Sequence, residues 1–230
     1  MARKPQSRGK CIYCGEEAAK GGMPKHLATC AARAQVIQSP ETSKQPVETL
    51  WHIRIQDAYA ADFWLDLEMR GSATLDKLDK YLRAIWLECC GHLSKFTVGS
   101  WGGHDVGKAR KADDIFSKEA VIDHLYDFGT TSETKIKVVG SRTGSATSKH
   151  PIALMARNNM PEATCQQCEN PATHLCLECL YEATDENENW FLCDEHAENH
   201  PHTEYGEPIP LVNSPRLGMC GYTGPAEPPY

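Results

Sequence analysis

The sequence predicts an α+β fold: a mixed or antiparallel sheet with one packed helix, and small zinc-stabilised modules on its N-terminal and C-terminal sides. Two observations predict the body. Apolar and polar residues alternate over several short segments, as in half-buried strands, and one longer segment has the spacing of an amphipathic helix. Cysteine content predicts the modules, because eight of the eleven cysteines fall in two clusters that also contain histidines.

Five short segments have the character of strands. Residues 50–57 and 63–69 alternate apolar and polar side chains, and residues 93–98 form a further strand. Residues 121–128 and 134–139 flank a GTTSE segment and are typical of a β-hairpin. We expect these strands to pair in one sheet.

The main helix is predicted between the second and third of these strands. Ser72 or Thr74 can cap its N-terminus, and Gly91 ends it. Its apolar face has helical spacing and comprises Leu75, Leu78, Leu82, Ile85 and Trp86. A short helix is expected over residues 112–119, and residues 141–150 are interpreted as a polar loop.

Composition divides the chain into five segments. Residues 1–35 hold one Cys/His cluster and a basic arm, and residues 36–48, polar with two prolines, form a predicted linker. Residues 49–160 form the predicted α+β core, and residues 161–205 hold the second Cys/His cluster. Residues 206–230 are rich in Pro and Gly, and we expect this tail to wrap over other surfaces.

Charge is distributed unevenly along the chain, whose formal net charge is -7. Residues 1–35 carry seven Lys/Arg against Glu16 and Glu17, whereas residues 161–230 carry thirteen acidic residues against Arg216. A basic segment attracts polyanions, which an acidic segment repels. We therefore expect nucleic acid (DNA or structured RNA) to bind the N-terminal segment and a protein partner to bind the acidic C-terminal segment.

Hydropathy and cysteine use predict a cytoplasmic protein without membrane contact. No apolar run approaches the ~20 residues that span a bilayer, and the basic N-terminus lacks the apolar segment of a secretory signal. Disulfides are disfavoured in a reducing compartment. The eleven cysteines therefore indicate metal binding.

The first cluster has the spacing Cys11-x2-Cys14-x11-His26-x3-Cys30. A two-residue gap lets both thiolates of a turn face one ion, and residues at i and i+4 share one face of a helix, which Pro24 can start. Four such ligands satisfy tetrahedral zinc. The alternative is a reduced loop without metal, but a segment this short and polar does not fold alone without such a link.

Basic residues surround this zinc finger and predict contact with phosphates. The predicted nucleic-acid-binding residues are Arg3, Lys4, Arg8, Lys10, Lys20, Lys25 and Arg33. A lone finger reads about three base pairs at most, so its specificity would be weak. The alternative is a structural or protein-binding finger.

The second cluster contains eight candidate ligands, enough for two zinc ions. They are Cys165, Cys168, Cys176, Cys179, Cys193, His196, His200 and His202. The seven residues between the two CxxC pairs are too few for an independent core, so we expect alternate pairs to share an ion. One ion is assigned to Cys165, Cys168, Cys193 and His196, and the other to Cys176, Cys179, His200 and His202. The rival is one zinc held by the two CxxC pairs.

This second spacing resembles the B-box type of cross-brace zinc domain over about forty residues. With the finger, it predicts three zinc ions in all. No coordination position is left for catalysis, because every plausible ligand is used. Cys89 and Cys90 are interpreted as buried thiols that act as small apolar residues, since adjacent cysteines and His92 would share an ion only with strain.

Three stretches of the middle segment together resemble a known family. They are TLDKLDKYLRAIWLECCGHLSKF, HLYDFGTTSETKIKVV and HPIALMARNNMP. The family is that of the plasmid pRiA4b open-reading-frame-three-like proteins, often described as TnpR-like passenger proteins of an insertion element. In some members paired CxxC motifs and a closing NSPR-x-G-x-CGY stretch follow, and residues 213–222 are similar to that stretch. The resemblance spans roughly residues 49–224.

The resemblance implies an α+β domain in a prokaryotic, mobile-element setting, without an established activity. The N-terminal finger is an addition to that family's core pattern. We expect a non-enzymatic zinc protein that binds nucleic acid through the finger and uses its body and acidic zinc domain as an interaction platform. The alternatives are a protein-interaction adaptor and, with least support, a nucleic-acid-processing enzyme of a mobile element.

Overall fold

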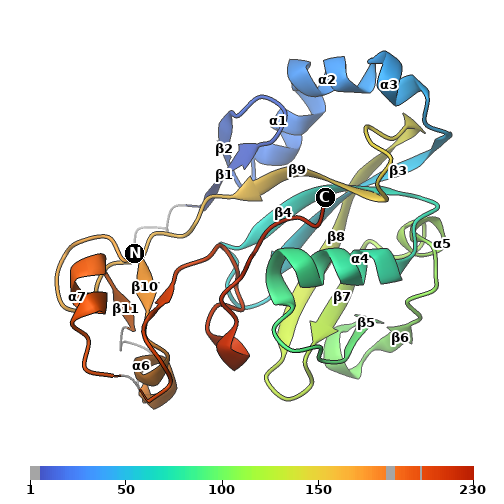
Figure 1. Cartoon of the computed structure of the whole chain (residues 1–230). Coiled ribbons are helices and arrows are strands. Elements are labelled where there is room, and N and C mark those ends of the chain that lie inside the picture. Colours follow the sequence, from blue (N-terminus) through green and yellow to red (C-terminus); the bar gives the residue numbers. More distant parts are fainter. Residues whose placement is uncertain (1–5, 185–189, 203) are drawn as a thin grey trace, which may run out of the picture.

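A large antiparallel sheet organises the chain in the computed structural model, which describes residues 6–184, 190–202 and 204–230 (Figure 1). Within these residues the sheet has nine strands. Their order across the sheet is β2 (Glu17–Ala19), β1 (Arg8–Cys11), β9 (Ile152–Asn158), β4 (Trp64–Arg70), β3 (Val47–Asp57), β8 (Ser132–Ser145), β7 (Val121–Tyr126), β5 (Ser94–Val98) and β6 (His104–Val106). With its helices and its cysteine clusters, this arrangement confirms the predicted α+β fold class.

Each of the five predicted strands is present, with some differences in length. β3 pairs with β8 along its whole length, from Val47 opposite Ser145 to Asp57 opposite Thr134, with a register shift between His52 and Ile53. The interpretation of residues 141–150 as a loop is therefore wrong for residues 141–145, because β3 supplies backbone partners even to polar residues there. β1, β2, β6 and β9 were not expected from the sequence.

One face of the sheet is covered by α4 (Leu75–Leu82), which continues as a π-helical turn over Arg83–Leu87. Every residue of the predicted apolar stripe of this helix is fully buried. It packs on Leu65, Leu67 and Met69 of β4, and α5 (Ala112–Phe116) adds to the same core. The predicted helix is confirmed, and it ends before Gly91, as expected.

The opposite face of β4 is covered by the N-terminal segment. α1 (Met23–Thr29), α2 (Ala31–Ile37) and α3 (Pro40–Ser43) follow β1 and β2, and β1 pairs with β9. Met23 and Leu27 are buried with Trp64 of β4. β4 is therefore buried on both faces rather than half-buried, and the predicted linker over residues 36–48 contains α3 and the start of β3.

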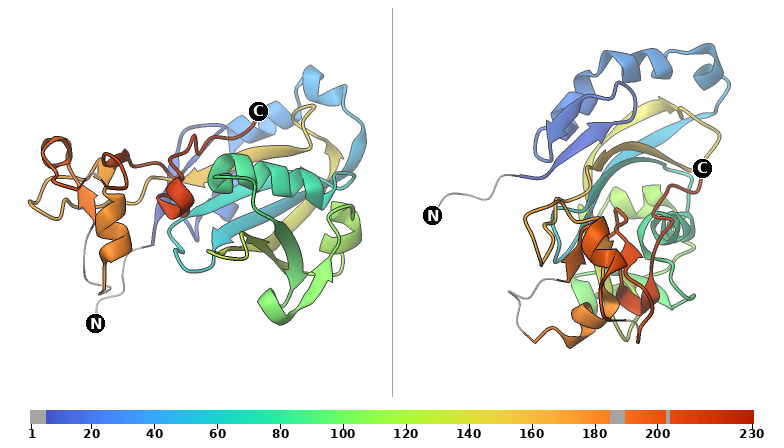
Figure 2. Two further views of the ribbon diagram at one scale, coloured as in Figure 1. Left: turned by 60° about the horizontal axis from the view of Figure 1, so that its bottom comes forward. Right: turned by 60° about the vertical axis from the view of Figure 1, so that its left-hand side comes forward.

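The second Cys/His cluster forms a small unit beside the sheet, which we call the C-terminal module (residues 165–184 and 190–202) (Figure 2). It contains β10 (His174–Leu175), α6 (Leu177–Glu182), β11 (Phe191–Leu192) and α7 (Asp194–Glu198). β12 (Ile209–Pro210), from the tail, pairs with β10. None of the described helices is long and apolar enough to cross a membrane.

The tail after β12 returns to the body, as expected. The Ser214 hydroxyl donates to the Trp86 carbonyl at 2.7 Å, and the fully buried Arg216 pairs with Asp127 at 2.5 Å. A single 3-10 turn, η3 (Met219–Gly221), follows. At the chain end, the Tyr230 ring stacks on His150 with their centroids 4.1 Å apart. The tail therefore links the C-terminal module to the core.

α4 is also held by a buried charge cluster around Asp79. One oxygen of its carboxylate, Oδ1, accepts from Ser94 (2.6 Å) and His124 (2.7 Å), and the other, Oδ2, accepts from Arg83 and Lys108 (both 3.0 Å). Burial by itself would raise the pKa of Asp79, but hydrogen bonds from His124, Ser94 and Lys108 hold it far below its usual value. Burial lowers the pKa of His124, so its neutral ring donates to the carboxylate.

Replacing Asp79 by Asn should lower the free energy of unfolding by about 3 kcal/mol, because the cations of the cluster lose their counter-charge. Denaturant titration measures the loss. Asp76→Asn, on the same helix, is the matched control. Its carboxylate is 40% exposed where it pairs with Lys80, so its effect should stay below about 1 kcal/mol. Equal losses of unfolding free energy in Asp79→Asn and Asp76→Asn would contradict a stabilising role for the buried cluster.

The same cluster predicts a pH dependence. Because the folded pKa of Asp79 is depressed, its contribution to stability is fully present above the unfolded value of about 4 and is lost as the pH falls below that value. Unfolding titrations between neutral and acidic pH should show this loss in the wild type. Asp79→Asn should lack the part of this acid-induced loss of stability that comes from Asp79. The same dependence of stability on acidic pH in the variant and the wild type would contradict the prediction.

Candidate metal centres

The first metal group comprises Cys11, Cys14, His26 and Cys30, whose donor atoms all lie within 4.8 Å of one another. Cys11 ends β1, and Gly15, in the left-handed region with φ +76°, closes the turn that carries Cys14. The Gly15 amide donates to the Cys11 carbonyl at 2.9 Å. α1 supplies His26, and Cys30 lies between α1 and α2.

Polar contacts orient the donors of this group. His26 Nε2 lies 3.4 Å from Cys14 Sγ, while its Nδ1 lies 3.5 Å from the Glu16 carboxylate. A carboxylate behind a histidine is the usual way in which proteins orient a metal ligand. Burial raises the pKa of the Cys11 thiol to about 11. Without a cation the thiol stays neutral at pH 7, so a bound metal would have to stabilise the thiolate.

The second group comprises Cys165, Cys168, Cys193 and His196, and the third comprises Cys176, Cys179, His200 and His202. In each group the donor atoms lie within 4.8 Å of one another. The C-terminal module therefore brings its ligands together in the same two interleaved sets that the sequence predicted. The rival arrangement, with both CxxC pairs around one ion, is not the one observed.

Backbone amides support the sulfur atoms of the module. The Gln167 amide donates to Cys165 Sγ and the Cys179 amide to Cys176 Sγ, each at 3.4 Å. Burial would raise the pKa of Cys165, but backbone N–H groups of Gln167, Cys193 and Cys168 outweigh it and lower that pKa to about 6. Cys165 is therefore largely a thiolate at pH 7, the form that binds metal.

The distances between donor atoms fit tetrahedral coordination. His196 Nδ1 lies 3.4, 3.5 and 3.2 Å from the sulfurs of Cys165, Cys168 and Cys193, and Cys168 Sγ lies 3.8 Å from Cys193 Sγ. Donors at about 2.3 Å (S) and about 2.0 Å (N) from a zinc ion lie about 3.5–3.8 Å from one another. All three groups could hold a metal ion, and each supplies a full set of four ligands.

The predicted nucleic-acid-binding residues do not form one surface. Lys10 and Lys25 are exposed, and no described acidic side chain pairs with them. Arg8 is also exposed, but its guanidinium donates to the Glu17 carbonyl at 2.9 Å and lies 4.0 Å from the exposed Glu17 carboxylate. Arg3 and Lys4 lie outside the described residues.

Lys20 and Arg33 have partners within the fold instead. The Lys20 ammonium donates to the Ala61 carbonyl at 2.8 Å, and burial together with the nearby Arg54 lowers its pKa. Arg33 pairs with the buried Glu68 at 2.9 Å. The sequence does not reveal these roles, because each partner lies 35 or more positions away.

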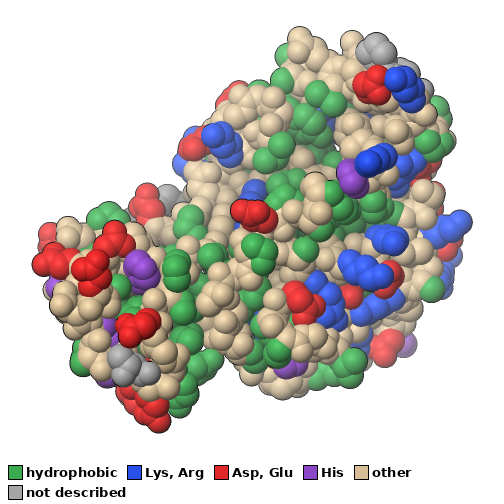
Figure 3. Space-filling view, viewed as in Figure 1, with side chains coloured by type: hydrophobic (Ala, Val, Ile, Leu, Met, Phe, Trp, Pro, Cys, Tyr) green, Lys and Arg blue, Asp and Glu red, His purple; other side chains and the backbone are tan. Residues whose placement is uncertain are grey.

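Acidic side chains gather on the C-terminal module in the view of Figure 3, whereas Lys and Arg lie mainly over the body. The two ends of the molecule therefore present opposite charges. The acidic surface agrees with the thirteen acidic residues among residues 161–230, whereas the basic side chains over the body lie outside residues 1–35.

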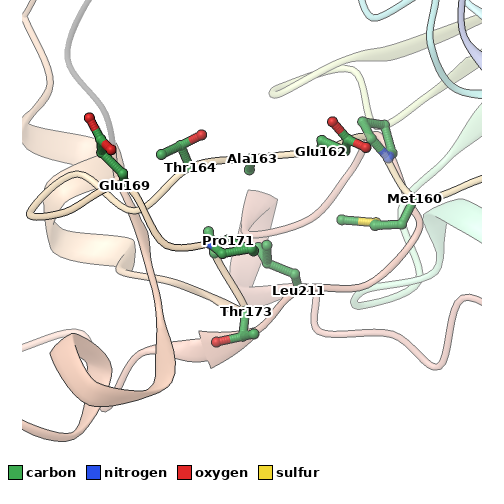
Figure 4. A pocket seen from close by; sticks show the side chains of 10 residues that line it. Met160, Glu162, Ala163, Thr164, Glu169, Pro171, Thr173 and Leu211 are labelled. Carbon is green, nitrogen blue, oxygen red and sulfur yellow. The ribbon is translucent and has the colours of Figure 1, made fainter.

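A pocket of about 560 Å³ lies where the chain enters the C-terminal module (Figure 4). Met160, Pro171 and Leu211 line it, and Glu162 and Glu169 are its only titratable lining residues. Figure 4 shows these two carboxylates at opposite ends of the pocket. It contains none of the metal groups.

Cys89, Cys90 and His92 form a further group of donor atoms that the sequence analysis did not identify as a site. Cys90 is exposed, so its interpretation as a buried apolar filler is wrong, whereas the half-buried Cys89 packs against the main core. The signal in the sequence was the pair of adjacent cysteines followed, after Gly91, by a histidine.

The interleaved ligand sets can be tested by paired substitutions and elemental analysis. Cys165→Ala with His196→Ala removes two ligands of one group, so the protein should lose one zinc ion per molecule. Cys165→Ala with His202→Ala breaks both groups and should lose two. If the two CxxC pairs shared an ion, the two double variants would lose the same number of ions, because each of them breaks that shared site through Cys165→Ala.

The comparisons with known proteins identify no family. No family model and no curated protein matches the chain. Among solved structures, the crystal structure of a protein of unknown function, MM3350 from Methanosarcina mazei Go1, is similar with a TM-score of 0.42 and 17% identity. The match covers 49% of this chain and 71% of that chain. Similarity at this level supports no functional argument, and membership of the pRiA4b family stays a prediction.

Proposed function

We propose that this chain is a non-enzymatic zinc protein that associates with nucleic acid through its N-terminal finger (residues 6–37). The observation that carries the proposal is the exposure of Lys10 and Lys25 on the finger, without acidic partners among the described residues, beside the exposed Arg8. Exposed cations on a rigid support can neutralise phosphates and release counterions. Zinc, as the ion in all three groups, and the prokaryotic mobile-element setting belong to the same proposal.

The proposed interface contains fewer basic residues than the seven that the sequence predicts. Lys20 and Arg33 have partners within the protein, so their charges are partly or fully offset. Among described residues, Lys10 and Lys25 remain for phosphate contact, together with Arg8, whose exposed ion pair with Glu17 is long at 4.0 Å. Three contacts correspond to a slope of log affinity against log salt of about -2 to -3.

The test is fluorescence anisotropy with labelled duplex DNA and with structured RNA over a series of salt concentrations. The variant Arg8→Ala, Lys10→Ala, Lys25→Ala should weaken binding and reduce the salt slope by about 2–3 units. The matched control removes the same charge from the body through Lys77→Ala, Lys111→Ala, Lys118→Ala, all at exposed positions. Absence of binding at low salt, or equal losses in both variants, would rule out the finger as the nucleic-acid interface.

A protein-interaction adaptor is the second candidate, and the C-terminal module favours it. Tyr181 and Tyr205 are 51% and 54% exposed, and their rings contact edge to face with centroids 5.5 Å apart. An exposed aromatic pair on an acidic unit suits a basic peptide segment. Tyr181→Ala with Tyr205→Ala should weaken binding of a lysine- and arginine-rich peptide and leave nucleic-acid binding unchanged. Equal peptide binding by the variant and the wild type would exclude this surface.

A further inference from the structure

The three cysteines outside the four-ligand groups meet at one place. Cys89 and Cys90 follow the π-helical turn after α4, and the tail brings Cys220 next to them although it is 130 positions away from Cys90. His92 lies between the two elements and belongs to both donor groups found here, one with Cys89 and Cys90 and one with Asp127 and Cys220. Every cysteine of the chain therefore lies in a cluster with histidine.

A left-handed glycine gathers the first of these groups. Gly91 has φ +80°, a conformation that other residues rarely adopt, and it reverses the chain after Cys90. His92 Nε2 consequently lies within hydrogen-bond distance of Cys90 Sγ, at 2.9 Å, and the two sulfurs lie 3.6 Å apart. An ion between them would replace that hydrogen bond and move the sulfur and nitrogen apart to about 3.5 Å. The sequence predicts backbone strain if two adjacent cysteines share an ion. Neither Cys89 nor Cys90 has a positive φ angle, so their φ angles show no such strain.

The group is partly accessible to solvent. Cys90 is exposed, and the His92 side chain is 30% exposed. It supplies three donor atoms rather than four. Three protein ligands of the Cys2His type, with the fourth position open to water, are typical of zinc sites that exchange a ligand.

The surroundings balance the charge that such a site would have. Asp127 Oδ2 lies 3.4 Å from His92 Nε2, and Arg216 donates to Asp127, to Cys89 Sγ at 3.4 Å and to Cys220 Sγ at 3.5 Å. Two thiolates and one carboxylate carry three negative charges. One guanidinium and one divalent cation together neutralise them.

We propose that Cys89, Cys90 and His92 bind one thiophilic divalent cation, with zinc as the test ion, and leave a coordination position open on the side of Asp127 and Cys220. The cation is additional to those of the three four-ligand groups. Because one ligand is missing and the site is exposed, the ion exchanges faster than theirs. The site does not depend on whether the finger binds nucleic acid.

Zinc counting at a buffered free zinc concentration tests the proposal on the full chain. The wild type should bind one more zinc ion per molecule than Cys90→Ser or His92→Gln. Cys220→Ser is the matched control, since it removes a neighbouring exposed thiol that is not among the three ligands, and it should retain the additional ion. Equal counts in the wild type and Cys90→Ser, or loss of the ion in Cys220→Ser, would overturn the ligand assignment.

Alkylation gives a second measurement, in which all the cysteines are left in place. Added zinc should slow the reaction of iodoacetamide with Cys90 in the wild type by at least about tenfold, and His92→Gln should abolish most of that protection. Peptide mass spectrometry reads the modification at Cys90 itself. An alkylation rate in the wild type that does not respond to zinc would overturn the proposal.

Discussion

Buried carboxylates and their cationic partners determine which parts of this chain pack together. A carboxylate removed from water costs several kcal/mol unless a cation and hydrogen bonds compensate it. Glu68 on β4 obtains that compensation from Arg33 of the N-terminal finger, and Asp127, just after β7, obtains it from Arg216 of the tail. Asp79 obtains it from Arg83, one turn further along the same helix, and from Lys108. The finger and the tail are thus held to the sheet by ion pairs as well as by apolar contacts.

This arrangement changes the meaning of charge in the sequence. A basic residue near the finger looks like a phosphate ligand when only its position in the chain is known. Arg33 instead completes the burial of Glu68, and Lys20 donates to a backbone carbonyl. What remains exposed is a smaller basic surface on the finger and an acidic C-terminal module. Under the proposed function, these two surfaces take partners of opposite charge.

The cysteines divide by geometry into two kinds of site. The three groups with four ligands come from short turns that face a helix or a second pair, and they leave no position for an exchangeable ligand. They replace the apolar core that such small units lack. The cluster at Cys89, Cys90 and His92 is different, since it has three donors and lies against a buried arginine. A metal there would not be needed to hold a module folded.

Local features were determined by the sequence alone: the helix after Thr74, five strands of the body and the ligand spacings, including the interleaved sets. The helix and the strands depend on the periodicity of nearby residues. The ligand sets depend on closely spaced cysteines and histidines, which the chain can combine in only a few arrangements. The partners of Arg33, the strand β9 and the meeting of Cys89 with Arg216 were decided only by the tertiary structure. The last pair is 127 positions apart, and no local pattern encodes which distant segment satisfies a buried charge or a sheet edge.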